Sequence, residues 1–343
     1  MEADPSRMLD AVLRLPAQCA EGYRAGREAS DLPSADSATS IVVCGMGGSG
    51  VAGDVLAALY RGRLGIPVVA VKDFTLPEFC GKDTLVICSS YSGSTAETLA
   101  CFHEAMERGC RVLAVTSGGE LAWRAEAAEM GVVSIPGGLQ PRCAIGYLVF
   151  AVLGALEEAG ALPRLEADVS YCAAALGRVA AEVAPDHPTG VNPAKALATA
   201  IGDRVPVVWG AEGLGAVAAR RWKTQVNENA KGPAMASALP ELDHNEVVGW
   251  PTGSGEGFFL VTLRHGGEHP DISGRFDVSV AVVAASGIEH REVRAQGRSA
   301  LTDLMWLIMV GDATSVYLGL VRGVDPAPIE AIHRVKRALE ERE

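Results

Sequence analysis

The feature that most constrains the fold is an alternation, repeated through residues 41–160, of short β-branched runs, Gly- or Ser-rich loops and Ala-rich stretches. Such alternation is typical of a parallel sheet wrapped by helices, because each parallel strand needs a crossover to return the chain to the same end of the sheet. The expected elements are strands at 41–44, 84–89 and 111–116 and helices at 51–60 and 95–108.

A second set of strands is expected after the Ala-rich stretch 164–183, at residues 205–209, 258–263 and 278–283. The predicted fold is therefore α/β, with two sandwiches in tandem, each a parallel sheet flanked by helices. A chain of 343 residues with 48% hydrophobic residues is large enough for two such domains. We expect them to span residues 1–183 and 184–343.

Segments that contain Gly and Pro are expected to form the connections. The domain boundary is expected in 184–193, and further loops at 251–257 and 265–275. Residues 299–321 are expected to form one long apolar helix. Gly-Val-Asp-Pro follows that helix and ends it, and a last helix is expected at 328–341.

The net charge and the lengths of the apolar runs indicate which kinds of partner and which cellular location to expect. The formal net charge is −12, and Lys and Arg are scattered singly, which argues against a nucleic-acid or anionic-membrane partner. The longest apolar runs, 147–156 and 304–310, are shorter than a membrane-spanning helix. The first four residues have neither the charged nor the apolar region of a secretory signal, so a cytoplasmic location is expected.

The cysteines give no sign of a metal site. All eight lie at or before residue 172, with no C-x-x-C pair and no metal-ligand spacing with histidine. We therefore expect reduced, mostly buried thiols and no bound metal.

Two loops rich in small residues follow two of the predicted strands. Gly45–Gly50 comes directly after one strand, and Ser90–Thr95 follows the next. Each loop opens a helix, where free backbone N–H groups and the helix dipole favour an anion such as a phosphate. Because the carboxyl ends of neighbouring parallel strands share one edge of the sheet, both loops are expected to converge on a single ligand.

The first loop also admits two other interpretations. Gly45, Gly47 and Gly50 fit the G-x-G-x-x-G outline of a dinucleotide site, but only Lys72-Asp73 stands near the position where an acidic residue would bind ribose. The loop could also be a tight strand-to-helix turn without a ligand. The second loop has four Ser and Thr hydroxyls in six residues, which is more than one helix cap needs and favours binding.

Residues 221–250 carry a carboxylate and an imidazole in a stretch otherwise rich in Ala, Leu and Pro. Glu228 lies in the motif Asn-Glu-Asn-Ala-Lys, and His244 lies in Asp-His-Asn-Glu. These two side-chain types most often transfer protons at neutral pH. Each alone could be a solvated surface residue, but the two motifs together favour a catalytic role.

Together with Pro141-Arg142, these motifs resemble those of the bifunctional phosphoglucose/phosphomannose isomerases, which are built from two sugar isomerase (SIS) domains. The resemblance runs in order from about residue 41 to the last helix. The SIS loops are shared by many phosphosugar binders, whereas the pair of motifs around Glu228 and His244 is much more specific. The resemblance implies an aldose–ketose isomerase that interconverts glucose 6-phosphate and/or mannose 6-phosphate with fructose 6-phosphate.

The resemblance implies a role for each matching residue. Glu228 would be the base that moves a proton between C1 and C2 of the opened sugar, and Arg142 would stabilise the enediolate oxygen as its charge forms. Arginine suits this role because the guanidinium keeps its proton. The 6-phosphate would be held by the backbone amides and hydroxyls of Gly47, Gly48, Ser49, Ser90, Ser92 and Thr95.

The resemblance also implies that His244 opens the sugar ring, with Lys336 in the last helix as its helper. In relatives the histidine comes from the neighbouring subunit, so a homodimer with shared active sites is expected. Neither a metal nor an organic cofactor is required for this reaction, because no electrons leave the substrate.

The chain departs from the family pattern near its end. Dual-specificity relatives place a small hydroxyl residue shortly after Gly-Val-Asp-Pro, whereas this chain has Ala327-Pro328-Ile329. An apolar side chain cannot hydrogen-bond a sugar hydroxyl, so the preference between mannose and glucose stays open. The departure favours an alternative function, a non-catalytic phosphosugar sensor or regulator.

Two further functions fit the sequence less well. An aminosugar synthase would need an N-terminal cysteine nucleophile domain, and a sugar-responsive repressor would need a basic helix-turn-helix. The opening Met-Glu-Ala is not expected to begin such a cysteine domain, and residues 1–30 are expected to be too short and insufficiently basic for a helix-turn-helix.

Overall fold

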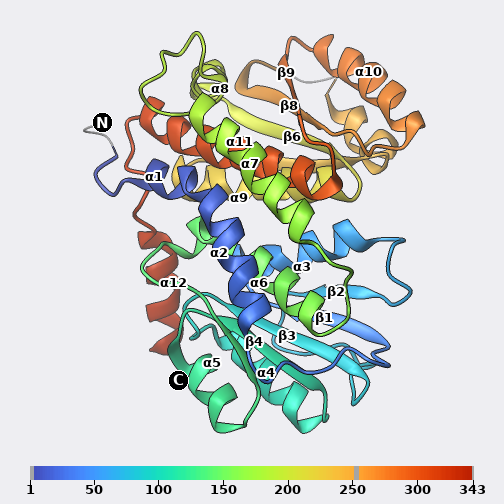
Figure 1. Cartoon of the computed structure of the whole chain (residues 1–343). Coiled ribbons are helices and arrows are strands. Elements are labelled where there is room, and N and C mark those ends of the chain that lie inside the picture. The colour runs from blue at the N-terminus through green and yellow to red at the C-terminus, as the bar shows by residue number, and fades with distance from the viewer. Residues whose placement is uncertain (1–3, 251–254, 342–343) are drawn as a thin grey trace.

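The computed structural model describes residues 4–250 and 255–341, and within them the strands form two parallel sheets (Figure 1). The first sheet has the order β2-β1-β3-β4-β5 and the second β7-β6-β8-β9, with every neighbouring pair parallel. The predicted α/β architecture with two parallel sheets flanked by helices is confirmed.

The strands of the first sheet are β1 (Ser40–Cys44), β2 (Val68–Val71), β3 (Thr84–Ser90), β4 (Arg111–Thr116) and β5 (Gly131–Ser134). Those of the second sheet are β6 (Val205–Ala211), β7 (Met235–Leu239), β8 (Phe258–Arg264) and β9 (Glu289–Arg294). Central strands such as β1 and β3 are buried along their whole length, which explains why they appear in the sequence as continuous apolar runs.

The helices of the first half are α1 (Met8–Leu13), α2 (Leu15–Glu28), α3 (Gly47–Tyr60), α4 (Ala96–Glu107), α5 (Gly119–Ala127), α6 (Ile145–Glu158) and α7 (Glu166–Glu182). Those of the second half are α8 (Pro193–Ile201), α9 (Leu214–Asn229), α10 (Pro270–Ala284), α11 (Ala300–Val321) and α12 (Glu330–Glu340). Short 3₁₀ turns are η1 (Pro141–Cys143), η2 (Glu241–His244), η3 (Glu246–Gly249) and η4 (Gly255–Gly257).

The predicted strand at 278–283 is wrong, because these residues belong to helix α10. Their β-branched valines suggested a strand, but the buried positions of α10 (Ile272, Phe276, Ser279 and Val283) recur at the three- and four-residue spacing of a helix. The predicted loop 265–275 is correspondingly too long, since α10 begins at Pro270 with His269 as its N-cap. Of the other predicted loop, residues 251–254 lie outside the described part, and the remainder forms η4.

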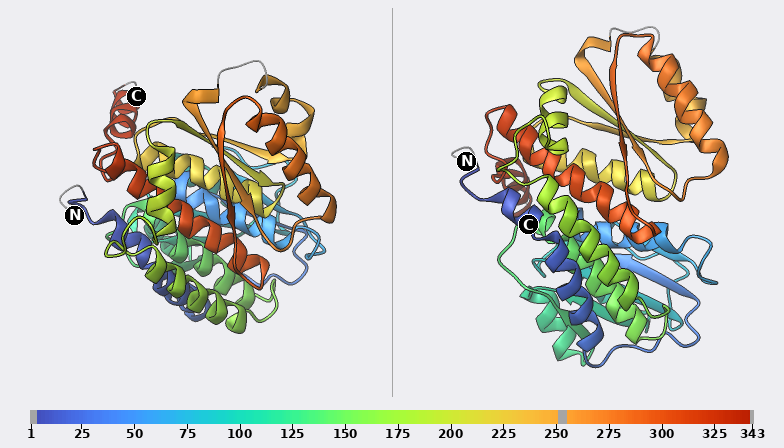
Figure 2. Two further views of the ribbon diagram at one scale, coloured as in Figure 1. Left: turned by 90° about the horizontal axis from the view of Figure 1, so that it is seen from above. Right: turned by 45° about the horizontal axis from the view of Figure 1, so that its top comes forward.

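Helices α2, α3, α6, α7, α9 and α11 form a layer between the two sheets (Figures 1 and 2). One apolar core runs through this layer and contains residues of both halves of the chain, such as Leu153 of α6 and Ile308 of α11. Two smaller cores cover the outer faces of the sheets, one under α4 and α5 and the other under α10. Helix α3 packs on the first sheet, α9 packs on the second, and the two helices contact each other.

Helix α11 is long and apolar enough to cross a bilayer, and it alone passes that test among the described residues. Of its most apolar window, 83% is buried inside the molecule. A helix that is apolar on all sides is expected at the centre of a large protein as well as in a membrane. Here α11 is a core helix that packs against α7, α8 and α9.

Candidate active site

The first small-residue loop connects β1 to α3 at the carboxyl edge of the first sheet. Gly47 has a φ of +51°, a backbone conformation that favours glycine, and it starts α3. Ser49 is buried in the first turn of the helix, and its Oγ accepts a hydrogen bond from the backbone N–H of Tyr91 at 3.0 Å. Ser89 Oγ donates to the carbonyl of Ser49 at 3.3 Å. The first loop is therefore fixed against the second.

The second loop connects β3, the neighbour of β1, to α4. The hydroxyls of Ser90 and Thr95 lie 3.0 Å apart, and Ser90 Oγ accepts from the Gly93 N–H at 3.1 Å. Ser92 is exposed beside them, and its Oγ accepts from Ser94 N at 3.4 Å. The structure thus brings the two loops together as the sequence predicted, with the helix N-termini and hydroxyls of both at one edge of the sheet.

The turn that carries Arg142 packs directly on the first loop. A Cβ atom added at Gly48 would lie 2.8 Å from the carbonyl oxygen of Pro141 and 3.1 Å from Cα of Arg142. Only a residue without a side chain allows this approach of two backbones. Arg142 is therefore fixed next to the loop at the start of α3.

The buried guanidinium of Arg142 is held by groups from two segments, the end of α9 and residues 326–327. Its Nε donates to Asn229 Oδ1 at 2.8 Å, and its Nη2 donates to the carbonyls of Pro326 and Ala327 at 2.9 Å each. Its Nη1 lies 3.4 Å from Glu228 Oε2. Arg142 therefore has a fixed orientation, with its positive charge facing the carboxylate of Glu228.

Glu228 lies one residue before the end of α9, and its side chain is 26% exposed. It is thus held by an ion pair and still accessible to a ligand. Next to it, Lys231 donates to the carbonyl of Pro326 at 2.8 Å and also contacts the carbonyl of Glu228. Burial lowers the pKa of Lys231, and the charge of Arg142 lowers it further. Lys231 is the last residue of the Asn-Glu-Asn-Ala-Lys motif, but the sequence analysis gave it no role.

A second buried arginine supports this arrangement. Arg221 of α9 forms a paired contact with Asp312 of α11, with Nε to Oδ1 at 3.0 Å and Nη2 to Oδ2 at 2.8 Å. The same Nη2 donates to the carbonyl oxygen of Arg142. Sequence reasoning missed this role of Arg221, because nothing in the local pattern links residues that lie 91 positions apart.

His244 lies far from Glu228 along the second sheet. Helix α9 starts after β6 at the carboxyl edge of that sheet, and its 16 residues carry the chain about 24 Å back to the amino edge, where Glu228 lies. Strand β7 then returns to the carboxyl edge, where η2 ends with His244. His244 is exposed, and its side chain makes no hydrogen bond or ion pair to the rest of 4–250 and 255–341. One chain therefore does not bring His244 to Glu228.

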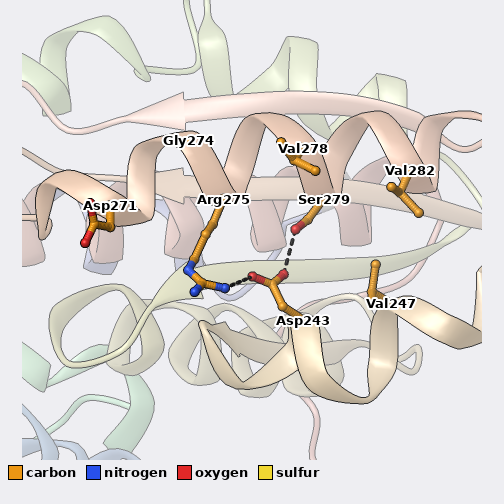
Figure 3. Close-up of a pocket in the computed structure, with 8 residues that line it drawn as sticks. All are labelled: Asp243, Val247, Asp271, Gly274, Arg275, Val278, Ser279 and Val282. Carbon is orange, nitrogen blue, oxygen red and sulfur yellow. Dashed lines mark hydrogen bonds and ion pairs between the residues drawn. The ribbon is translucent and has the colours of Figure 1, made fainter.

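The segment that carries His244 is anchored on both sides of it. Asp243 accepts from Ser279 at 2.6 Å and pairs with Arg275 at 3.1 Å (Figure 3). Glu246 accepts from the indole N–H of the buried Trp209 at 2.9 Å. His244 therefore projects from a fixed turn although it is itself exposed.

Lys336 is exposed on α12 and makes no hydrogen bond or ion pair within the described part of the chain. The segment just before α12 is nevertheless part of the site, because Pro326 and Ala327 accept the hydrogen bonds of Arg142. The structure thus gathers the two loops, Arg142 and Glu228 at one place, whereas His244 lies away from it and Lys336 makes no hydrogen bond or ion pair to any of these residues.

The chain is similar to curated proteins along nearly its whole length. It is 33% identical over 336 residues to the bifunctional phosphoglucose/phosphomannose isomerase of Caldicellulosiruptor bescii, covering 97% of this chain and 99% of that one. It is 34% identical to the protein of the same name from Aquifex aeolicus, over 87% of this chain and 90% of that one.

A family model and a solved structure also match this chain. The model for the bacterial phospho-glucose isomerase C-terminal SIS domain matches residues 190–339. The crystal structure of a hypothetical protein from Thermus thermophilus superposes with a TM-score of 0.77 at 16% identity, covering 98% of this chain and 91% of that one, which shows a shared fold. On the sequence identity and coverage of its relatives, the chain belongs to the bifunctional phosphoglucose/phosphomannose isomerases, a family of double SIS-domain aldose–ketose isomerases.

Proposed function

We propose that this chain interconverts glucose 6-phosphate and/or mannose 6-phosphate with fructose 6-phosphate through a cis-enediolate. The observation that carries the proposal is the position of Glu228, which faces the fixed guanidinium of Arg142 at 3.4 Å while the backbone of Arg142 packs on Gly48 of the first loop. A base, a cation and an anion-binding loop thus lie within the reach of one phosphorylated sugar.

The two loops are suited to the phosphate. Gly47, Gly48 and Ser49 would offer N–H groups at the start of α3, and the hydroxyls of Ser90, Ser92 and Thr95 would complete the ring of donors. Backbone amides and the helix dipole can bind a dianion without a cluster of arginines. This would allow a protein with a formal net charge of −12 to bind an anionic substrate.

Glu228 is suited to the proton transfer. A hydrogen on the carbon beside a carbonyl is a weak acid, so the base must be held close and the enediolate oxygen must be stabilised as it forms. The carboxylate of Glu228 would take the proton from C2 of the aldose and return it to C1, and Arg142 would meet the developing negative charge. Because Arg142 is already oriented by Asn229 and two carbonyls, little reorganisation is needed during the reaction.

His244 and Lys336 would act in ring opening, as in the family pattern, with His244 supplied by the partner in a homodimer. The position of His244 at the opposite edge of the second sheet supports a shared site, since the histidine and Glu228 of one chain are too far apart to act on one sugar. We also infer a cytoplasmic enzyme without nucleic-acid or membrane partners, and domains that divide near residues 183 and 184.

A second candidate is a phosphosugar-binding protein without turnover. It is favoured by Ile329, which supplies no hydroxyl at the start of α12. The fixed geometry of Arg142 and Glu228 is not required by a sensor, which needs only the loops. We therefore favour the isomerase.

The test is proton exchange at carbon. The purified protein is incubated with fructose 6-phosphate in heavy water, and deuterium at C2 of glucose 6-phosphate and mannose 6-phosphate is followed by proton NMR. Wild type should incorporate deuterium, Glu228→Gln should not, and Glu182→Gln, which changes an exposed glutamate at the end of α7, should behave as wild type. Exchange that persists in Glu228→Gln would exclude Glu228 as the base, and binding of the sugar without exchange by wild type would favour the sensor.

A further inference from the structure

Helices α9 and α11 approach each other closely at Asn229, the last residue of α9. On α11, Gly311, Ser315 and Gly319 recur every four residues and therefore lie on one face of the helix. A Cβ atom at Gly319 would lie 2.6 Å from the carbonyl oxygen of Asn229, and one at Gly311 would clash with an indole of α9. Because these small residues allow the close approach, a side chain as short as serine reaches from α11 to α9.

A chain of hydrogen bonds runs from α11 through Asn229 to Arg142. Ser315 Oγ donates to the carbonyl oxygen of Asp312 at 2.7 Å, and it accepts from Nδ2 of Asn229 at 2.9 Å. Oδ1 of the same amide accepts from Nε of Arg142 at 2.8 Å. Asn229 and Ser315 are fully buried, and Arg142 is nearly so. Bulk water therefore does not reach this chain to replace a missing member.

The single hydrogen of the Ser315 hydroxyl sets the direction of these hydrogen bonds. That hydrogen is donated to Asp312, so the hydroxyl offers only a lone pair to Asn229. A lone pair requires the amide NH₂ at that end of Asn229 and the amide oxygen at the other end, which faces Arg142. With the amide reversed, its NH₂ would meet the Nε–H of Arg142, and two donors would face each other. Ser315 thus determines that Asn229 presents an acceptor to Arg142.

Asn229 is one of three acceptors on Arg142 that carry no charge. The other two are the backbone carbonyls of Pro326 and Ala327, which accept from Nη2. Among the described residues, the only carboxylate in an ion pair with Arg142 is that of Glu228. Neutral acceptors orient the guanidinium without neutralising it, so its charge stays available for an anion that forms on the substrate. A change in the orientation of Arg142 would therefore weaken binding of the enediolate more than binding of the uncharged carbonyl.

We propose that Ser315 is a positioning residue for the isomerisation, which acts on Arg142 through the amide of Asn229. The inference rests on the proposed function and adds a residue of α11 to those that support the site. Loss of the hydroxyl would leave Nδ2 of Asn229 without its acceptor and allow the amide to rotate. Nε of Arg142 would then lose a fixed partner while Nη2 keeps its two carbonyls, so the guanidinium would pivot and move Nη1 relative to Glu228.

Steady-state kinetics tests this role. Ser315→Ala removes the hydroxyl and leaves a residue of nearly the same size, so the packing of α9 on α11 should persist. We expect kcat for fructose 6-phosphate to fall about 10- to 100-fold with KM changed by less than about twofold, because the lost interaction acts on the transition state. The matched control is Thr314→Val, which removes a neighbouring buried hydroxyl that donates within α11, to the carbonyl of Val310 at 2.7 Å. The control should have wild-type kinetics.

Two inhibitors separate a positioning role from general damage to the site. A phosphorylated hydroxamate has planar oxygens that imitate the enediolate, whereas sorbitol 6-phosphate has the phosphate and hydroxyls without a planar charged group. Ser315→Ala should weaken binding of the hydroxamate by the same factor as kcat, and leave the affinity for sorbitol 6-phosphate within about twofold of wild type. An equal loss of affinity for both inhibitors would show general disruption of the site and overturn the inference.

The free protein gives a readout that does not depend on turnover. The Nε–H of Arg142, identified by its absence from the N–H correlation spectrum of Arg142→Lys, should exchange slowly with water because it is buried and hydrogen bonded. Its exchange should be at least about tenfold faster in Ser315→Ala and unchanged in Thr314→Val. Unchanged exchange in Ser315→Ala would overturn the inference even if kcat fell, because the hydroxyl would then not hold Arg142 in place.

Failure of the inference and failure of the proposed function can be told apart. A wild-type kcat in Ser315→Ala, together with exchange at carbon by the wild type, would refute the inference and leave the isomerase standing. Absence of exchange at carbon in the wild type would refute the isomerase and with it the catalytic part of the inference. The exchange of the Arg142 Nε–H would still decide whether Ser315 holds the guanidinium.

Discussion

Replacing Asp312 by Asn should destabilise the folded chain by about 3–5 kcal/mol, because it leaves the charge of Arg221 buried without an opposite charge. The two side chains are only 1% and 5% exposed, so water cannot take the place of the carboxylate. An ion pair at the surface is expected to contribute much less to stability. Arg164 and Glu166 are 77% and 59% exposed, and loss of such a pair costs about 0–1 kcal/mol.

Thermal unfolding followed by circular dichroism measures this difference. With about 2.1 cal/mol/K of unfolding entropy per residue, a chain of 343 residues that unfolds as one unit gains roughly 0.7 kcal/mol/K. Asp312→Asn should then lower Tm by about 4–7 °C, and the control Glu166→Gln by less than about 1.5 °C. A Tm shift in Asp312→Asn no larger than that of the control would refute the reasoning that this pair anchors α9 to α11.

Four further outcomes are expected. Burial lowers the pKa of His265 and of His290 below 6.5, so the unfolded chain binds protons that the folded chain does not. The free energy of unfolding in urea should fall as the pH drops from about 7.5 to about 5.5, by up to about 1.4 kcal/mol per pH unit for each histidine, and replacing both by Gln should remove this slope. All cysteines are buried, so a thiol reagent should react with none in the native protein and with eight after denaturation. Gly48→Ala should lower kcat/KM by up to about 100-fold with an unchanged far-UV spectrum, because its Cβ displaces the backbone of Arg142, and wild-type kinetics would contradict this. Ile329→Thr should change the ratio of kcat/KM for mannose 6-phosphate and glucose 6-phosphate by about 2- to 10-fold, the value of one hydrogen bond, and an unchanged ratio would show that residue 329 does not contact the sugar.

Much of the fold follows from local patterns. The buried strands β1, β3 and β4 were predicted from continuous apolar runs, and α11 was predicted from its length and composition. Edge strands were harder to identify. β9 has the sequence Glu-His-Arg-Glu-Val-Arg, and it forms a strand because β8 beside it offers hydrogen-bonding partners. The valines of α10 show the opposite case, in which packing on the second sheet overrides the β-preference of the side chains.

Some features of the candidate site could likewise be predicted from the sequence, and others could not. The two loops could be placed from the sequence, because a turn after a parallel strand always lies at the carboxyl edge of its sheet. The partner of Arg142 could not be found in this way, since Glu228 lies 86 residues away and only the packing of α3 against α9 brings the two together. Nor could the sequence reveal that Arg221 and Asp312 hold the carbonyl of Arg142 in place.

The amino-acid sequence by itself determined the parallel α/β architecture, the two small-residue loops and the types of reacting group, because each depends on the order of residues within one or two elements. Only the tertiary structure decided which groups meet. It set Glu228 against Arg142 and put His244 at the far edge of the second sheet, since α9 and β7 run in opposite directions between the two positions. Contacts between distant residues depend on how helices and sheets pack, and that packing is a property of the whole chain.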